Sequence, residues 1–241
     1  MSWLELRRPR DISALFGDAL RAYWRHAGAF LLVSATIVIP ADLIVRGVGM
    51  HQLSGPYDDS PTLPETLVPG ALSFLVVAPL VTATCIYALR DVAAGTRPRA
   101  GRALASGLEA FRPIFLAVLL AALGIGLGLL LLVIPGIYLV VRWYFVPQAV
   151  VLEQAQGPGA LGASGRVVEG FWWRAFGIVV LTSLAGTLPS FVLITPFAAI
   201  AKSADRALWS LIGQMAAETV TTPFVALVST LLYFDLRSRR A

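Results

Sequence analysis

The chain has 241 residues, of which 57% are hydrophobic and only 14% are charged. A soluble domain carries about 25% charged residues, so this composition excludes a water-soluble protein and predicts an integral membrane protein. The net charge of +5 does not indicate nucleic-acid binding, because the basic residues lie at the ends of apolar runs, as they do in membrane proteins. The single cysteine, Cys85, excludes an intramolecular disulfide.

The first part of the chain, residues 1–26, predicts a basic arm followed by an amphipathic helix. Its apolar residues recur with helical spacing at Ile12, Leu15, Phe16, Ala19 and Tyr23. The other face of this helix carries Asp18, Arg21 and Arg25. Because it is too polar to span a bilayer, we expect it to lie in the headgroup plane. The alternative is a soluble helix packed on a partner.

Residues 27–93 predict the first two membrane crossings, at about 27–48 and 67–89. Each has the length of roughly 20 residues that a hydrocarbon core of about 30 Å requires. Pro40 and Pro79 lie inside these crossings, and proline there usually kinks the helix. The intervening segment contains acidic residues but no lysine or arginine, which is typical of an outside loop.

Residues 94–152 predict a second amphipathic helix and two further crossings. The helix is indicated by Leu104, Leu108 and Phe111, which share one face. The crossings are expected at about 113–134 and 137–152, with the helix broken at Pro135-Gly136. Glycines inside the first of them suit close helix packing better than a phosphate loop.

Residues 153–241 predict a third amphipathic helix at about 160–173 and two crossings at about 175–201 and 207–234. The fold class expected from the whole chain is therefore an all-α integral membrane protein with six transmembrane helices and three interfacial amphipathic helices. It forms a single helical membrane domain over residues 1–241.

The distribution of basic residues predicts that both termini are cytoplasmic, in the plasma membrane. With that topology, all but four of the lysines and arginines fall in cytoplasmic segments; the exceptions are Arg46, Arg142, Lys202 and Arg206. Cytoplasmic loops of membrane proteins carry such an excess.

A weak repeat is also visible in the sequence. Three times an amphipathic helix precedes two crossings, and an apolar-proline step lies in each unit at Pro40, Pro135 and Pro196. Because each unit crosses twice, successive units keep one orientation, which predicts three parallel helix-hairpin repeats.

Several motifs resemble the membrane domain of glycerophosphoryl diester phosphodiesterases and its stand-alone relatives. They are Pro135-Gly136-Ile137-Tyr138, Arg142-Trp143-Tyr144-Phe145, Val150-Val151-Leu152-Glu153, Ala160-Leu161 with Ser164, Gly170 with Trp173-Arg174, and Leu231-Leu232-Tyr233-Phe234-Asp235-Leu236-Arg237. The resemblance covers most of the chain and is strongest after about residue 130. It implies a helical membrane domain, which in that family can precede a soluble catalytic barrel. The sequence ends directly after its last crossing, so we expect no barrel and no phosphodiesterase activity.

Two charged residues within predicted crossings, Arg142 and Glu218, are candidates for a functional site, because a charge inside the bilayer is costly. Their estimated depths differ by roughly 9 Å, which helix tilt and a long side chain could partly close. We expect them to form a pair that locks two helices. The alternative is a substrate or proton role. Asp42 is a rival partner for Arg142, although Arg46 on the same helix competes for it.

A second candidate is a charge network at the cytoplasmic boundary, formed by Glu153, Arg174, Asp235 and Arg237. It would either fix the interfacial helices or bind lipid headgroups. Arginines of the amphipathic helices are the expected ligands of anionic headgroups: Arg21, Arg25, Arg102, Arg112, Arg166 and Arg174.

Three functional classes remain open on the sequence. A non-catalytic membrane module for scaffolding or lipid interaction is favoured, because the chain lacks a catalytic constellation and has clustered arginines near the membrane surface. The expected partners are the bilayer with its anionic headgroups and a membrane or cytoplasmic protein, with no metal and no cofactor. A small transporter that uses Arg142 and Glu218 is the alternative. An intramembrane enzyme is the third class.

Overall fold

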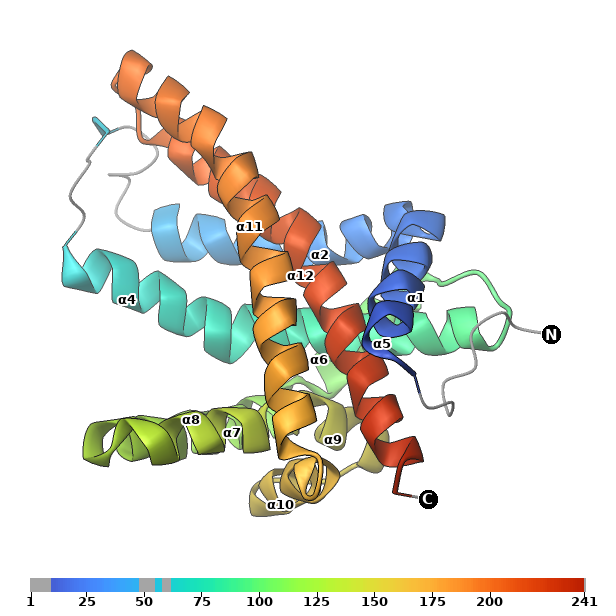
Figure 1. Cartoon of the computed structure of the whole chain (residues 1–241). Helices are drawn as coiled ribbons and strands as arrows, with labels where there is room; N and C mark the ends of the chain where they lie inside the picture. The colour runs from blue at the N-terminus through green and yellow to red at the C-terminus, as the bar shows by residue number, and fades with distance from the viewer. Residues whose placement is uncertain (1–9, 48–54, 58–61, 241) are drawn as a thin grey trace.

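The computed structural model describes residues 10–47, 55–57 and 62–240, and every element within them is a helix (Figure 1). The elements are α1 (Ile12–Arg25), α2 (Ala27–Gly47), α4 (Leu63–Leu72), η1 (Ser73–Val77), α5 (Ala78–Ala93), α6 (Ala100–Glu109), α7 (Phe111–Leu131), α8 (Val133–Trp143), α9 (Val146–Glu153), α10 (Pro158–Val168), α11 (Trp172–Ala204) and α12 (Leu208–Ser238). Six of the resulting spans are long and apolar enough to cross a membrane: α2, α4–η1–α5, α7, α8–α9, α11 and α12. The predicted all-α membrane class is confirmed.

The outward faces of the long helices are strongly apolar. Near the turn between α7 and α8, Leu130 is 83% exposed and Ile134 is 81% exposed. Large apolar side chains are normally withdrawn from water, so their exposure over whole helix faces fits contact with lipid.

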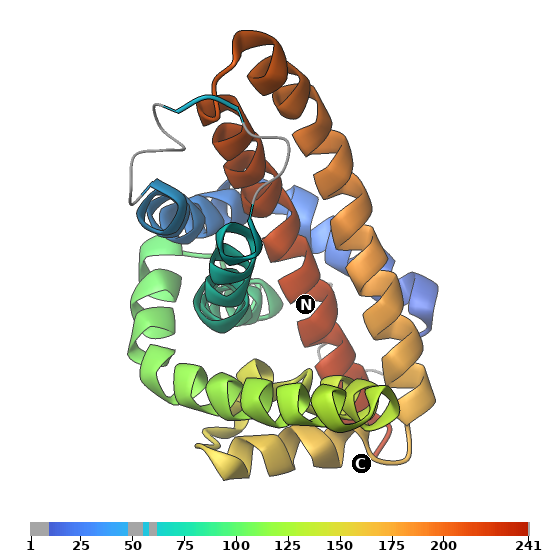
Figure 2. The same ribbon diagram turned by 90° about the vertical axis from the view of Figure 1, so that its left-hand side faces the viewer.

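Helix α12 lies at the centre of the molecule and packs against α1, α2, α5, α10 and α11. Its C-terminal half is the most buried part of the fold, with Leu231, Leu232 and Tyr233 fully enclosed. Helix α11 runs beside α12 along its length, and the two cross α2 steeply in both views (Figures 1 and 2). Arg10, the first described residue, lies beside the end of α12, since its backbone N–H donates to Asp235 at 2.7 Å.

The short helices α1, α6 and α10 each precede two long ones, in the order that the repeat predicts. Each buries one face: Leu15 and Ala19 of α1, Ala103 of α6 and Ala160 of α10 are enclosed. The third ends earlier than expected. Gly170 has a φ of +80°, which a glycine adopts without strain, and this turn places Trp172 and Trp173 in α11.

The break between α7 and α8 lies at Leu132, where the backbone is extended, and not at Pro135-Gly136 as the sequence predicted. Pro135 instead occupies the first turn of α8, where a missing N–H removes no intrahelical hydrogen bond. Glycines allow the two helices of this hairpin to approach each other closely. A Cβ on Gly136 would come within 2.3 Å of the Leu129 side chain, and one on Gly124 within 2.4 Å of Trp143.

The second span contains a π-helical turn, η1, directly before Pro79. A proline inside a helix clashes with the carbonyl four residues earlier, and a wider turn relieves this contact. The fourth span is interrupted between α8 and α9. Ser164 of α10 bridges this break, since its Oγ donates to the Arg142 carbonyl at 2.8 Å and accepts from the Phe145 N–H at 3.2 Å.

Candidate functional site

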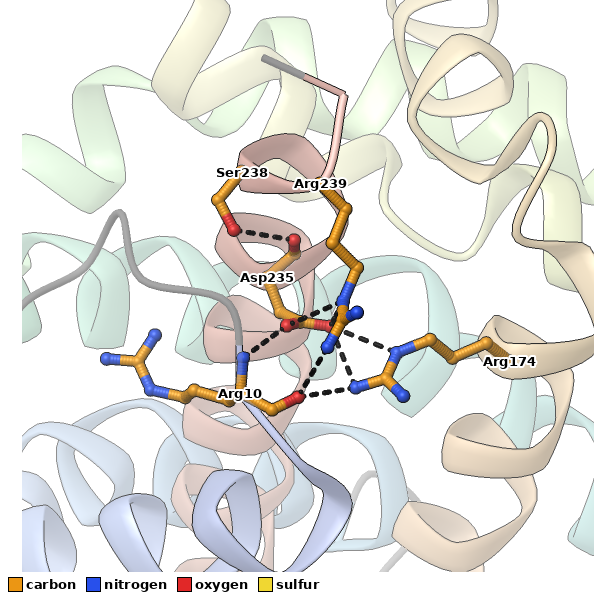
Figure 3. Close-up of polar contacts among 5 residues, drawn as sticks. All are labelled: Arg10, Arg174, Asp235, Ser238 and Arg239. Atoms are coloured by element: carbon orange, nitrogen blue, oxygen red, sulfur yellow. Dashed lines mark hydrogen bonds and ion pairs between the residues drawn. The ribbon is translucent and has the colours of Figure 1, made fainter.

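Within the described residues, the carboxylate of Asp235, near the end of α12, binds several partners (Figure 3). Its side chain is fully buried. Oδ1 accepts the backbone N–H of Arg10 at 2.7 Å, Oδ2 accepts Nε of Arg174 at 3.1 Å, and Nε of Arg239 lies 3.1 Å from Oδ1. One carboxylate therefore joins the segment before α1, the start of α11 and the end of α12.

The two arginines also share a second acceptor, the carbonyl of Arg10. It accepts from Arg174 at 2.6 Å and from Arg239 at 2.9 Å. The Arg10 side chain turns away and pairs with Asp18 of α1 at 3.1 Å. Because Arg174 and Arg239 both bind protein oxygens, their geometry is that of a clasp holding three segments together.

A second, separate group surrounds Glu153 at the end of α9. The Tyr233 hydroxyl donates to Oε1 of Glu153 at 2.5 Å, and Arg237 lies 3.5 Å from the same oxygen. Arg237 is more than half exposed, whereas Tyr233 is enclosed. This group fastens α9 to α12.

The four residues of the predicted boundary network thus fall into two groups, Arg174 with Asp235 and Glu153 with Arg237. Within the described residues, no hydrogen bond or ion pair joins the groups. The sequence interpretation missed Arg10, Arg239 and Tyr233. The i,i+4 spacing of Asp235 and Arg239 could have indicated their pairing, whereas a backbone N–H from residue 10 carries no sequence signal.

The predicted pair of Arg142 with Glu218 is not formed. The Arg142 guanidinium donates to the Tyr138 hydroxyl at 2.7 Å, one turn back on α8. Its side chain crosses α10, where a Cβ on Gly165 would come within 2.9 Å of Nε. The physical reason is the short hairpin, because α8 packs on α7, α10 and α11. Glu218 instead accepts a hydrogen bond from Ser73 of η1 at 3.0 Å. Asp42, the suggested rival partner of Arg142, is buried. The side chain of Arg46, which was expected to compete for Asp42, lies outside the described residues.

The largest cavity described here has a volume of about 810 Å³ and lies between the α1–α2 junction and the link from α5 to α6. Two arginines, Arg25 and Arg97, line it together with His26, and its described lining contains no acidic side chain. Trp24 stands at its edge and is 69% exposed, an arrangement typical of the bilayer interface.

The backbone adds to the positive character of this cavity, which we call the basic pocket. It includes Ala27 and Gly28, the first residues of α2. Within the described residues their N–H groups have no acceptor, since the first hydrogen bonds of this turn come from Ala29 and Phe30. Free N–H groups at a helix start attract anions.

Burial lowers the pKa of His26 below its usual value, and the charges of Arg25 and Arg97 lower it further. The imidazole is therefore disposed to be neutral while the pocket is empty of anions. An anion bound there would oppose both arginine charges and raise this pKa.

The other arginines expected to bind headgroups are differently placed. Arg21 lies 3.6 Å from Asp18, and Arg102 lines a smaller cavity of about 230 Å³ beside Arg90 and Asp91. Arg112 and Arg166 are exposed. Of the predicted set, Arg25 is the one that lines the basic pocket.

The comparisons with known proteins give no match: no family model, no curated protein and no solved structure is similar to this chain. The resemblance to the phosphodiesterase membrane domain accordingly stays a hypothesis. Within the described residues, no group of three or more histidine, cysteine or acidic side chains could hold a metal ion.

Proposed function

We propose that this protein is a non-catalytic, multi-pass membrane module that binds phosphate-bearing lipid headgroups at the basic pocket. In this proposal both termini face the cytoplasm, because most arginines lie in the segments that this topology places there. The membrane is the plasma membrane. The observation that carries the proposal is the joint lining of one cavity by Arg25, Arg97 and the start of α2.

The position of the pocket supports a lipid ligand over a soluble one. It lies where an amphipathic helix meets a membrane span, and the exposed Trp24 marks the depth of the headgroups. Each basic residue near an anionic surface contributes about 1 kcal/mol to binding. Two arginines and free N–H groups therefore favour an anionic headgroup over a zwitterionic one.

The transport alternative receives no such support. It depended on Arg142 and Glu218, which neither meet nor line the cavities described here. Both have protein partners, as expected of charges that are held structurally.

The test compares two double variants of equal charge by native mass spectrometry. The full chain is taken from nanodiscs containing equal parts of phosphatidylglycerol and phosphatidylcholine, and the retained lipids are counted. We expect Arg25→Gln with Arg97→Gln to lower the retention of phosphatidylglycerol roughly 30-fold. The control, Arg112→Gln with Arg166→Gln, removes two exposed charges elsewhere and should lower it far less.

Three outcomes would overturn the pocket assignment. Equal losses in both double variants would indicate a diffuse surface effect, and unchanged retention would show that the pocket binds no lipid. Glycerol phosphate serves as a soluble competitor. If it displaced the lipid at equal concentration, the ligand would be a soluble phosphate compound.

A further inference from the structure

A second cavity lies within the membrane-spanning part of the fold and differs from the basic pocket in its lining. Its volume is about 440 Å³, and its walls come from η1–α5, α7, α8–α9, α11 and α12. Apolar side chains such as Phe74, Ile125 and Val225 form most of this lining, and no charged side chain contributes to it. Ligand cavities commonly combine such a lining with a few polar groups.

Gln148 is a buried polar side chain on this lining. It is 2% exposed, and its Nε2 donates to Oγ of Ser229 at 3.0 Å. The Ser229 hydroxyl itself donates to the Ala226 carbonyl at 3.0 Å. Its hydrogen is thus committed, and Ser229 can only accept from Gln148. This fixes the orientation of the amide, with Nε2 toward Ser229.

The other end of the amide has no partner. Oε1 of Gln148 is buried and has no hydrogen-bond donor among the described residues. A buried acceptor left unsatisfied is expensive, because it has lost its water and gained nothing. The aliphatic hydroxyls of Thr82 and Ser183 cannot supply the donor, since Thr82 donates to Ala78 at 2.7 Å and Ser183 donates to Val179 at 2.9 Å.

We propose that this cavity binds one uncharged amphiphile, with its hydrocarbon chain along the apolar walls and its hydroxyl donating to Oε1 of Gln148. A charged headgroup would lose its hydration without finding a counter-charge. A pure hydrocarbon would leave Oε1 unsatisfied. A long-chain alcohol or another neutral lipid with a free hydroxyl meets both conditions, and Tyr144, which also lines the cavity, offers a second hydroxyl.

The test uses two probes that differ only in the donor, tritiated 1-dodecanol and its methyl ether. Saturable binding to the full chain in detergent is measured by scintillation proximity. We expect the alcohol to bind about 10-fold or more tightly than the ether, because only the alcohol satisfies the buried acceptor. Equal binding of the two probes, or no saturable binding, would overturn the proposal.

Variants assign the effect to this site. Gln148→Leu should abolish the preference for the alcohol. Gln214→Leu is the matched control, since Gln214 also has a buried Oε1 without a partner but does not line the cavity, and it should keep the preference. Ala78→Leu narrows the cavity while keeping Gln148, and it should weaken the binding of both probes. This variant tests the site even if Gln148→Leu fails to fold. A preference retained in Gln148→Leu would contradict the assignment.

Binding of a neutral amphiphile in this cavity does not depend on the proposed headgroup site. The dodecanol probe is uncharged, so the double variant Arg25→Gln with Arg97→Gln should bind it like the wild type. Loss of phosphatidylglycerol retention and loss of dodecanol preference can therefore be observed separately.

Discussion

Helix α1 begins at one arginine-rich region and ends at another, and the two differ in the groups that line them. At its start, Arg174 and Arg239 converge on the buried Asp235 and on a backbone carbonyl. At its end, Arg25 and Arg97 line a cavity whose described lining holds no acidic side chain. The first region, the Asp235 clasp, binds its arginines to protein oxygens, whereas the basic pocket is the place where we propose that an external anion binds.

This difference teaches that the number of arginines near a membrane surface does not identify a lipid site. Arg174 and Arg25 are equivalent in the sequence, each closing an amphipathic segment beside a tryptophan. The structure separates them, since Arg174 binds the buried Asp235, whereas Arg25 lines the basic pocket. Mutations in the clasp should accordingly lower the stability of the protein, whereas mutations in the pocket should weaken lipid binding.

The largest loss of stability is expected from Asp235→Asn. Loss of the buried carboxylate charge leaves Arg174 and Arg239 without compensation, and breaking such a pair costs about 3–5 kcal/mol. The free energy of unfolding can be measured by titrating SDS into mixed micelles. The control is Glu169→Gln, because the Arg240–Glu169 pair, 3.8 Å apart, is largely exposed and should contribute about 0–1 kcal/mol. Equal losses in the two variants would contradict a clasp.

The second group, around Glu153, separates the effect of burial from that of charge. Tyr233→Phe removes an enclosed hydroxyl that donates to a carboxylate and should cost about 1.5–3 kcal/mol. Arg237→Gln removes a more exposed partner of the same oxygen and should cost at most about 1 kcal/mol. The same SDS titration compares them. If Arg237→Gln proved the more destabilising, charge rather than burial would dominate this contact.

A reciprocal pair of variants tests the contrast between the clasp and the pocket directly. Arg97→Gln should weaken phosphatidylglycerol retention by about 1 kcal/mol, roughly fivefold, while changing stability by less than about 0.5 kcal/mol. Arg239→Gln should instead lower stability and leave lipid retention near the wild-type level. Native mass spectrometry and SDS titration of both variants check this. Similar responses of the two variants would show that the clasp and the pocket do not differ in this way.

The sequence carried enough information for the helices but not for their partners. Apolar periodicity and length predicted the six spans, because these are local properties of each segment. The pairing of Arg142 with Glu218 was inferred from the cost of a charge inside the bilayer and from helix depth. It is not formed, since α8 is a short hairpin arm held by α7, α10 and α11. The basic pocket joins segments about 70 residues apart, and no local pattern links His26 to Arg97.

The smallest expected effect concerns the protonation of His26. Burial, and then the charges of Arg25 and Arg97, lower its pKa in the folded state, so the unfolded chain binds the proton more readily. The resulting stability is fully present above the ordinary pKa of about 6.5 and is lost as the pH falls through the lowered value. His26→Gln should remove this part of the pH dependence. It is expected to amount to about 1 kcal/mol or less, measured by SDS titration between about pH 5 and pH 7.

Lipid should act on this histidine in the opposite direction. A phosphate group in the pocket offsets the two arginine charges and favours the imidazolium, so phosphatidylglycerol should raise the pKa of His26, while phosphatidylcholine should leave it low. NMR titration of the imidazole can follow this in a His51→Gln background, which removes the only other histidine. A pKa that is indifferent to phosphatidylglycerol would place the headgroup outside the pocket, even if Arg97→Gln still weakened retention.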